Sequence, residues 1–139
     1  MNPIIIVDSN RDDSDFLKES LIDEGAKAGF RCFSSSVPAL EYLKTTRDRP
    51  SLIISDVKLP QISGLSFKRS INDIENIADK NIPFFFFSSS KNEDLVDEAL
   101  CLSVDGYIRK PDYLTDFDIV AKKIKHYLDN HDIRDKTMN

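Results

Sequence analysis

Short, uninterrupted apolar runs recur along the chain, and each is bounded by polar or turn-forming residues. They are rich in β-branched and aromatic side chains and do not alternate with polar positions, which is typical of strands covered on both faces of a parallel sheet. The pattern predicts five strands. They occupy residues 4–7, 30–33, 52–54 and 84–87, with a weaker fifth strand at Tyr107 and Ile108.

Segments with helical spacing follow each of these runs. Asn92 is placed to cap one of them, and Thr115 with Asp118 has the form of a capping box at the start of the last. Strict alternation of strands and helices predicts an α/β fold with a doubly wound, five-stranded parallel sheet, because right-handed crossovers leave helices on both faces. The predicted helices span residues 12–24, 37–44, 65–78, 93–100 and 115–128.

The length of 139 residues fits a single domain, and 40% hydrophobic with 31% charged residues is the composition of a chain that folds in water. We expect one domain over residues 1–130, followed by a polar tail over residues 131–139 that frays. Cys32 and Cys101 lie far apart and outside any metal-binding spacing, so we expect two reduced thiols without a disulfide or a zinc site.

Charge and hydropathy exclude several classes of partner. A formal net charge of -5 has the wrong sign for a protein that neutralises phosphates along a nucleic acid. The apolar runs are far shorter than the roughly 18 residues of a membrane span. Because the first residues also lack the pattern of a secretory signal, we expect a cytoplasmic protein with neither nucleic acid nor membrane as partner.

Four chemically active side chains stand where the predicted strands end. The first strand leads into Asp8, the third into Asp56, the fourth into Ser88 and the fifth into Lys110. In an open α/β sheet, ligands bind beyond the carboxyl ends of the strands, so these side chains should meet at one edge. Two carboxylates at one site favour a hard divalent cation such as Mg²⁺. A carboxylate beside Mg²⁺ and a lysine can attack a phosphoryl group, which predicts an aspartyl phosphate.

The segments around these four residues resemble the receiver domain of two-component response regulators, in order and in spacing. They read IIIVDSN, LIISDVKLPQISG, IPFFFFSSSK and DGYIRKP, and the resemblance extends from Ile4 to Leu128. It implies a flavodoxin-like receiver fold of five βα units and a single-domain type of regulator. One such motif alone is weak, whereas four at the right strand ends are specific.

The resemblance also implies a role for each matching residue. Asp56 is the expected phosphoacceptor and a metal ligand, and Asp8 is an acidic residue of the metal site. Ser88 stands where the family senses the phosphoryl group through a hydroxyl, and Lys110 where a lysine pairs with that group. Three further positions follow: the main-chain carbonyl of Lys58 as a metal ligand, Tyr107 as the aromatic that switches rotamer, and Pro111 as a proline that is usually cis.

The sequence departs from the family at the metal site. The family carries two adjacent acids after its first strand, whereas Asp8 is followed by Ser9, and a hydroxyl is a much weaker Mg²⁺ ligand than a carboxylate. Lys58 adds a positive charge that would either repel the metal or replace part of its charge. Asp12 and Asp13 lie just beyond, and either is placed to supply the missing carboxylate directly or through water.

Two readings of the function therefore stay open. The first is a stand-alone receiver that takes a phosphoryl group on Asp56 from a histidine kinase or phosphotransfer protein, with Mg²⁺, and signals through an unidentified protein target. Its only chemistry would be self-phosphorylation from a donor and self-dephosphorylation, so it is not an enzyme in the usual sense. The second is a pseudo-receiver interaction module whose metal site is impaired by Ser9.

A third class, the aspartate-nucleophile phosphohydrolase, is disfavoured. Such an enzyme needs a second acid two positions after the nucleophile, and the corresponding residue after Asp8 is Asn10. The sequence leaves dimerisation through the last helices open, since no residue decides it.

Overall fold

The computed structural model describes residues 2–74 and 82–138, and describes side chains as far as Asn130. Its five strands form one parallel sheet in the order β2-β1-β3-β4-β5. This confirms the predicted doubly wound sheet. The strands are β1 (Ile4–Val7), β2 (Phe30–Phe33), β3 (Leu52–Ser55), β4 (Phe84–Ser88) and β5 (Gly106–Arg109).

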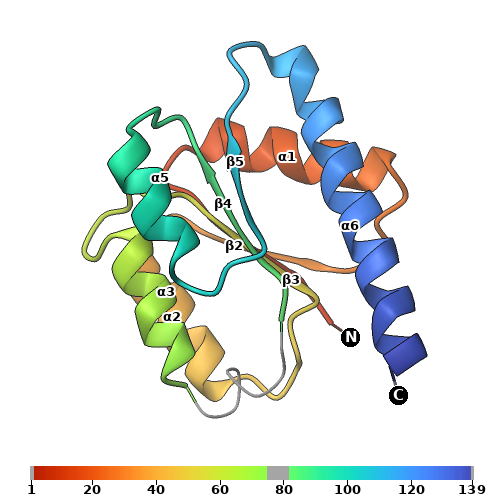
Figure 1. The fold of residues 1–139 in the computed structure, drawn as a ribbon, viewed down its shortest axis with the longest axis horizontal. Helices are drawn as coiled ribbons and strands as arrows, with labels where there is room; N and C mark the ends of the chain where they lie inside the picture. Colours follow the sequence, from red (N-terminus) through yellow and green to blue (C-terminus); the bar gives the residue numbers. More distant parts are fainter. Residues whose placement is uncertain (1, 75–81, 139) are drawn as a thin grey trace.

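Helices cover both faces of the sheet, as Figure 1 shows, with α1 and α6 on one side and α2, α3 and α5 on the other. The split follows from the alternation of side chains along each strand. In β4, for example, Phe84 and Phe86 pack under α2, α3 and α5, whereas Phe85 and Phe87 pack under α1 and α6. The helices are α1 (Arg11–Asp23), α2 (Ser36–Thr45), α3 (Gly64–Asn72), α5 (Glu93–Leu100) and α6 (Phe117–Met138).

The central strands β1, β3 and β4 are buried along their whole length, which explains their continuous apolar sequences. β2 and β5 lie at the edges of the sheet and are partly exposed. Among the described residues, no helix combines the length and the hydrophobicity that crossing a bilayer requires.

Two predicted helix boundaries need correction. The helix expected over residues 65–78 ends at Asn72, because the amides of Asp73 and Ile74 bond three residues back, to Ser70 and Ile71, and close the helix; residues 75–78 lie outside the described part. The capping box expected at Thr115 is not used as a helix start. Thr115 lies inside a 3₁₀ turn (Leu114–Asp116), and α6 begins after it.

Other helix ends agree with the sequence, and one runs longer. The side chain of Asn92 accepts hydrogen bonds from the amides of Asp94 and Leu95, so the predicted cap of α5 is confirmed. Residues 131–138, expected to fray as a polar tail, continue α6 as helix to Met138. Cys32 and Cys101 are free and exposed.

Candidate functional site

The four residues singled out at the strand ends are all buried at the carboxyl edge of the sheet. Asp8 follows β1, Asp56 follows β3, Ser88 is the last residue of β4, and Lys110 follows β5. Their exposed fractions are 4%, 9%, 1% and 9% respectively. Burial of three ionisable groups at one edge carries a large desolvation cost unless they compensate one another.

The ammonium group of Lys110 provides that compensation. Its Nζ lies 2.8 Å from Oδ2 of Asp8 and 2.9 Å from Oδ2 of Asp56. A third carboxylate joins them, because Oδ2 of Asp13, on α1, also lies 2.9 Å from Nζ. We call Lys110 and the three carboxylates of Asp8, Asp13 and Asp56 the Lys110 cluster. With all four groups ionised, three negative charges face one positive charge, so the cluster carries an excess negative charge that suits a divalent cation.

Burial shifts the protonation equilibria in this cluster. Desolvation raises the pKa of Asp8, and the hydrogen bonds it accepts from Lys110 and from the amide of Asn10 offset only part of this effect. For Lys110, desolvation alone would lower the pKa, but the hydrogen bonds to Asp8 and Asp56 outweigh it and raise the pKa above its usual range. Lys110 therefore stays charged at neutral pH.

Asp56 is held by backbone as well as by Lys110. Its Oδ1 accepts hydrogen bonds from the amides of Val57, at 2.7 Å, and Lys58, at 3.4 Å. The following turn brings α3 close to the main chain of Asp56. A Cβ atom at Gly64 would lie 2.1 Å from the carbonyl oxygen of Asp56, so only glycine fits there.

Ser88 and Tyr107 are connected through Ser90. The hydroxyl of Ser88 accepts a hydrogen bond from the amide of Ser90, and the carbonyl of Ser90 accepts one from the hydroxyl of Tyr107 at 3.3 Å. The amide of Lys110 in turn donates to the carbonyl of Ser88 at 2.8 Å. The end of β4 is thus linked both to the lysine of the cluster and to the aromatic ring on β5.

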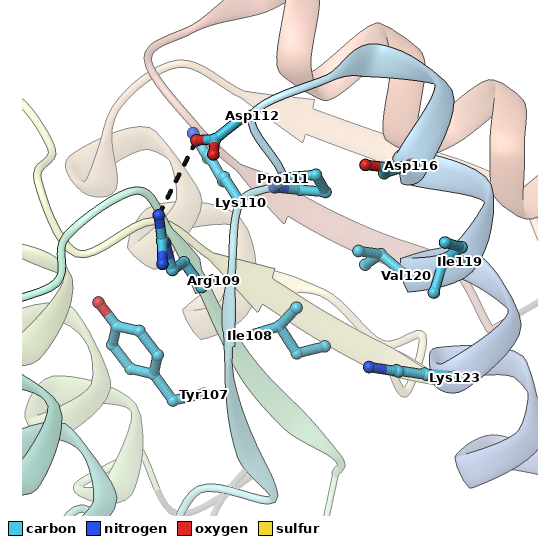
Figure 2. A pocket seen from close by; sticks show the side chains of 10 residues that line it. All are labelled: Tyr107, Ile108, Arg109, Lys110, Pro111, Asp112, Asp116, Ile119, Val120 and Lys123. Atoms are coloured by element: carbon cyan, nitrogen blue, oxygen red, sulfur yellow. Dashed lines mark ion pairs between the residues drawn. The ribbon is translucent and has the colours of Figure 1, made fainter.

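A cavity of about 580 Å³ borders this edge, between β5 and the start of α6. Figure 2 shows that the ring of Tyr107 lies on the opposite side of β5 from Ile119, Val120 and Lys123 of α6. The described residues contain no cis peptide bond, so Lys110 and Pro111 are joined by a trans bond, unlike the cis proline that the family resemblance implied.

The structure distinguishes between Asp12 and Asp13, the two residues that could replace the acid that the family carries at the position of Ser9. Ser9 and Asp12 are exposed and line an open depression with Asn10 and Arg11, whereas Asp13 reaches Lys110. The cap of α1 sets this orientation, because the side chain of Asn10 accepts a hydrogen bond from the amide of Asp13. Sequence reasoning named Asp13 as one alternative but missed its contact with Lys110.

The donor set is that of a hard cation. The carboxylates of Asp8, Asp13 and Asp56 each lie within 2.9 Å of the Lys110 ammonium group, and carboxylate oxygens are ligands that Mg²⁺ favours. Within residues 2–74 and 82–130, no group of three or more His, Cys, Asp or Glu is arranged around an ion position. The reason is visible in the cluster, since the three carboxylates converge on the Lys110 ammonium group.

A doubly wound parallel sheet with two acids, a hydroxyl and a lysine at its carboxyl edge is the arrangement of receiver domains. Comparison with known families agrees, since the model of the response regulator receiver domain matches residues 4–125. The chain belongs to this family. Receiver domains are signalling modules that bind Mg²⁺ in general and interact with histidine kinases and phosphotransfer proteins.

Similar proteins include whole regulators and solved receiver structures. The response regulator SaeR of Staphylococcus epidermidis is 26% identical over 111 residues, which are 80% of this chain and 44% of SaeR. The chain thus spans less than half the length of this curated relative. The phosphorylated cyanobacterial phytochrome response regulator RcpA has a TM-score of 0.83 and 26% identity, over 91% of this chain and 93% of RcpA.

Two further structures extend the comparison. The Mn²⁺-bound form of the response regulator Rcp1 has a TM-score of 0.80 and 25% identity, over 90% of this chain and 92% of Rcp1. A CheY-like receiver domain protein from Methanospirillum hungatei JF-1 has a TM-score of 0.76 at 21% identity, over 96% and 98% of the two chains, and supports the fold alone.

Proposed function

We propose that this chain is a receiver that accepts a phosphoryl group on Asp56 from a histidine kinase or phosphotransfer protein, in the cytoplasm and with Mg²⁺. Its output is contact with another protein. The observation that carries the proposal is the Lys110 cluster, in which Asp56 shares one ammonium group with Asp8 and Asp13. A purely structural ion pair would not need three carboxylates around one lysine.

The proposed reaction transfers a phosphoryl group from a histidine nitrogen to a carboxylate oxygen. A carboxylate oxygen of Asp56 forms a bond to phosphorus while the phosphorus–nitrogen bond of a phosphohistidine breaks. The electron pair of the broken bond remains on the imidazole nitrogen, which takes up a proton and leaves as neutral imidazole. Hydrolysis returns Asp56 to its unphosphorylated state, because water attacks phosphorus and releases inorganic phosphate and the Asp56 carboxylate.

Lys110 and the backbone around Asp56 prepare this step. Lys110 is already 2.9 Å from Asp56, so a small displacement brings its ammonium group to a phosphoryl oxygen. The amides of Val57 and Lys58 hold the other carboxylate oxygen and fix the orientation of the nucleophile. Asp8, Asp13, Asp56 and the Lys58 carbonyl would hold a Mg²⁺ ion, which would neutralise charge on the phosphoryl oxygens.

The switch follows from the bonds at Ser88. In the unphosphorylated chain, its hydroxyl accepts from the amide of Ser90, whose carbonyl holds the Tyr107 hydroxyl. A phosphoryl group on Asp56 offers the Ser88 hydroxyl a charged acceptor, which makes a stronger hydrogen bond. Movement of Ser88 toward that acceptor shifts Ser90 and the environment of Tyr107, and so changes the surface around β5.

The test is intact-mass analysis after incubation with a small-molecule phosphodonor and Mg²⁺. The proposal expects one phosphoryl adduct on the wild type and none on Asp56→Ala. Asp12→Ala is a suitable control, because Asp12 is an exposed acid of the same edge that lies outside the Lys110 cluster. An adduct that persists in Asp56→Ala, or the absence of any adduct on the wild type, would contradict the proposed phosphoacceptor.

A phosphorylation-independent interaction module is the second candidate, favoured by one observation. Ser9 stands in place of an acid and lies exposed, outside the Lys110 cluster. On this reading the three carboxylates simply keep Lys110 fixed in one arrangement. Equal binding of a partner protein by the wild type and by Asp56→Ala would favour the module over the switch.

A further inference from the structure

The loop that leads from Asp56 to α3 is held tightly at its base. The amide of Gly64 donates to the carbonyl of Val57 at 2.7 Å, which closes the loop on itself. Gln61, near the apex, has a φ of 71°, in the left-handed region that side chains rarely adopt. Such a conformation persists only where surrounding contacts impose it.

The hydroxyl of Ser36 makes those contacts from outside the loop. Its Oγ lies 2.8 Å from the carbonyl oxygen of Ile62 and 3.2 Å from that of Pro60, and it accepts a hydrogen bond from the amide of Ile62 at 3.3 Å. A hydroxyl has one hydrogen, so it donates to one of the two carbonyls at a time. These bonds hold the main chain on both sides of Gln61.

The start of α2 places this hydroxyl rigidly. Ser36 is the first residue of α2 and is fully buried. Its neighbour Ser35 occupies the N-cap position but makes no side-chain capping bond. Ala39, Leu40 and Leu43 are buried against the same face of the sheet as α3. A hydroxyl anchored in this way can fix a loop without moving with it.

We infer that Ser36 is a positioning residue for the phosphoacceptor site, because its bonds to Pro60 and Ile62 set the course of the loop that carries Lys58. The amide of Lys58 donates to Asp56, and the Lys58 carbonyl is the main-chain metal donor of the proposed function. The expected effect of Ser36 on metal affinity rests on the proposed function. Its effect on the geometry of the loop rests on the hydrogen bonds of Ser36 alone.

The first test measures amide hydrogen exchange in the metal-free protein for Ser36→Ala, with Ser35→Ala as the matched control. Ile62 loses the acceptor of its amide in Ser36→Ala, so its exchange should accelerate about fivefold or more, and that of Lys58 should follow. Ser35→Ala should leave both rates unchanged. Equal acceleration at Ile5 and Ile6 of β1 would assign Ser36 to global stability and overturn the inference.

The second test titrates Mg²⁺ by calorimetry into the wild type, Ser36→Ala, Ser36→Thr and Ser35→Ala. Affinity should fall several-fold in Ser36→Ala, recover in Ser36→Thr, which keeps the hydroxyl, and stay unchanged in Ser35→Ala. Equal affinity of the wild type and Ser36→Ala would overturn the positioning role and leave the proposed function intact. If the wild type bound no Mg²⁺, the proposed metal site would fail, and exchange confined to the loop would still support the role of Ser36.

Discussion

Asp13, in the first turn of α1, and Lys110, after β5, are 97 positions apart and form an ion pair of 2.9 Å. Asp13 is the third carboxylate on an ammonium group that already contacts Asp8 and Asp56. Its side chain is only 19% exposed, so solvent screens the interaction weakly. The pair brings a carboxylate of α1 to the ammonium group that also contacts Asp8, whose neighbour in the sequence, Ser9, is not an acid.

Substitution of Asp13 by Asn should weaken Mg²⁺ binding by about tenfold, because it removes one charged oxygen donor or one charge next to the ion. Calorimetric titration of the wild type and the variant measures the effect. Asp12→Asn is the control, since Asp12 is exposed on the same turn. A larger loss of affinity in Asp12→Asn than in Asp13→Asn would show that the wrong acid has been assigned.

Substitution of Ser9 by Asp should strengthen Mg²⁺ binding by about tenfold or more, because a carboxylate replaces a weak hydroxyl ligand beside Asp8. The same substitution should lower the contribution of Asp13 to the Mg²⁺ affinity. In a double-mutant cycle, Asp13→Asn should cost less affinity in the Ser9→Asp background than in the wild type. Strictly additive effects of the two substitutions would mean that Ser9 and Asp13 do not serve the same ion.

The sequence predicts the site residues at the strand ends because a parallel sheet brings all its carboxyl ends to one edge. It does not distinguish Asp12 from Asp13, since neighbours on a helix point about 100° apart and the phase of α1 depends on packing. The hydrophobic pattern also did not predict the length of α6 or the 3₁₀ turn before it. Ser36 gave no signal at all, because nothing in the run of three serines marks the one that faces the loop.

Removal of the Lys110 charge should strongly destabilise the protein. Lys110→Met keeps most of the side-chain volume but leaves three clustered carboxylates unpaired, at a cost of about 3–5 kcal/mol in the free energy of unfolding. Urea denaturation measures the loss. Mg²⁺ should restore more stability to Lys110→Met than to the wild type, because the cation binds the carboxylates without competition from the ammonium group.

A matched control separates this effect from the general cost of losing a lysine. Lys125 also forms an ion pair, with Asp129 at 2.8 Å, but the pair joins successive turns of one helix, and its two side chains are 29% and 57% exposed. Lys125→Met should therefore change the free energy of unfolding by less than about 0.5 kcal/mol. Similar losses in both lysine variants would contradict the special role of the Lys110 cluster.

Among the side chains that the structure describes, Lys68 of α3 is the other buried lysine, 7% exposed, and it should make the free energy of unfolding depend on pH in the alkaline range. Its Nζ lies 4.9 Å from the centre of the Phe84 ring, and Asp105 is the acid that faces it. Burial lowers the pKa of Lys68 below 10.5, and the charge of Asp105 offsets this only in part. Between the lowered pKa and 10.5, the unfolded chain binds more protons, so the free energy of unfolding rises with pH.

Lys68→Met removes this linkage, because it replaces a poorly solvated ammonium group with an apolar side chain of similar length. The variant should be more stable than the wild type at pH 7, and the difference should shrink as the pH approaches 10.5. Urea denaturation at several pH values measures it, with the exposed Lys91→Met as control. A gap between wild type and Lys68→Met that stays constant with pH would mean that Lys68 titrates alike in the folded and unfolded chains.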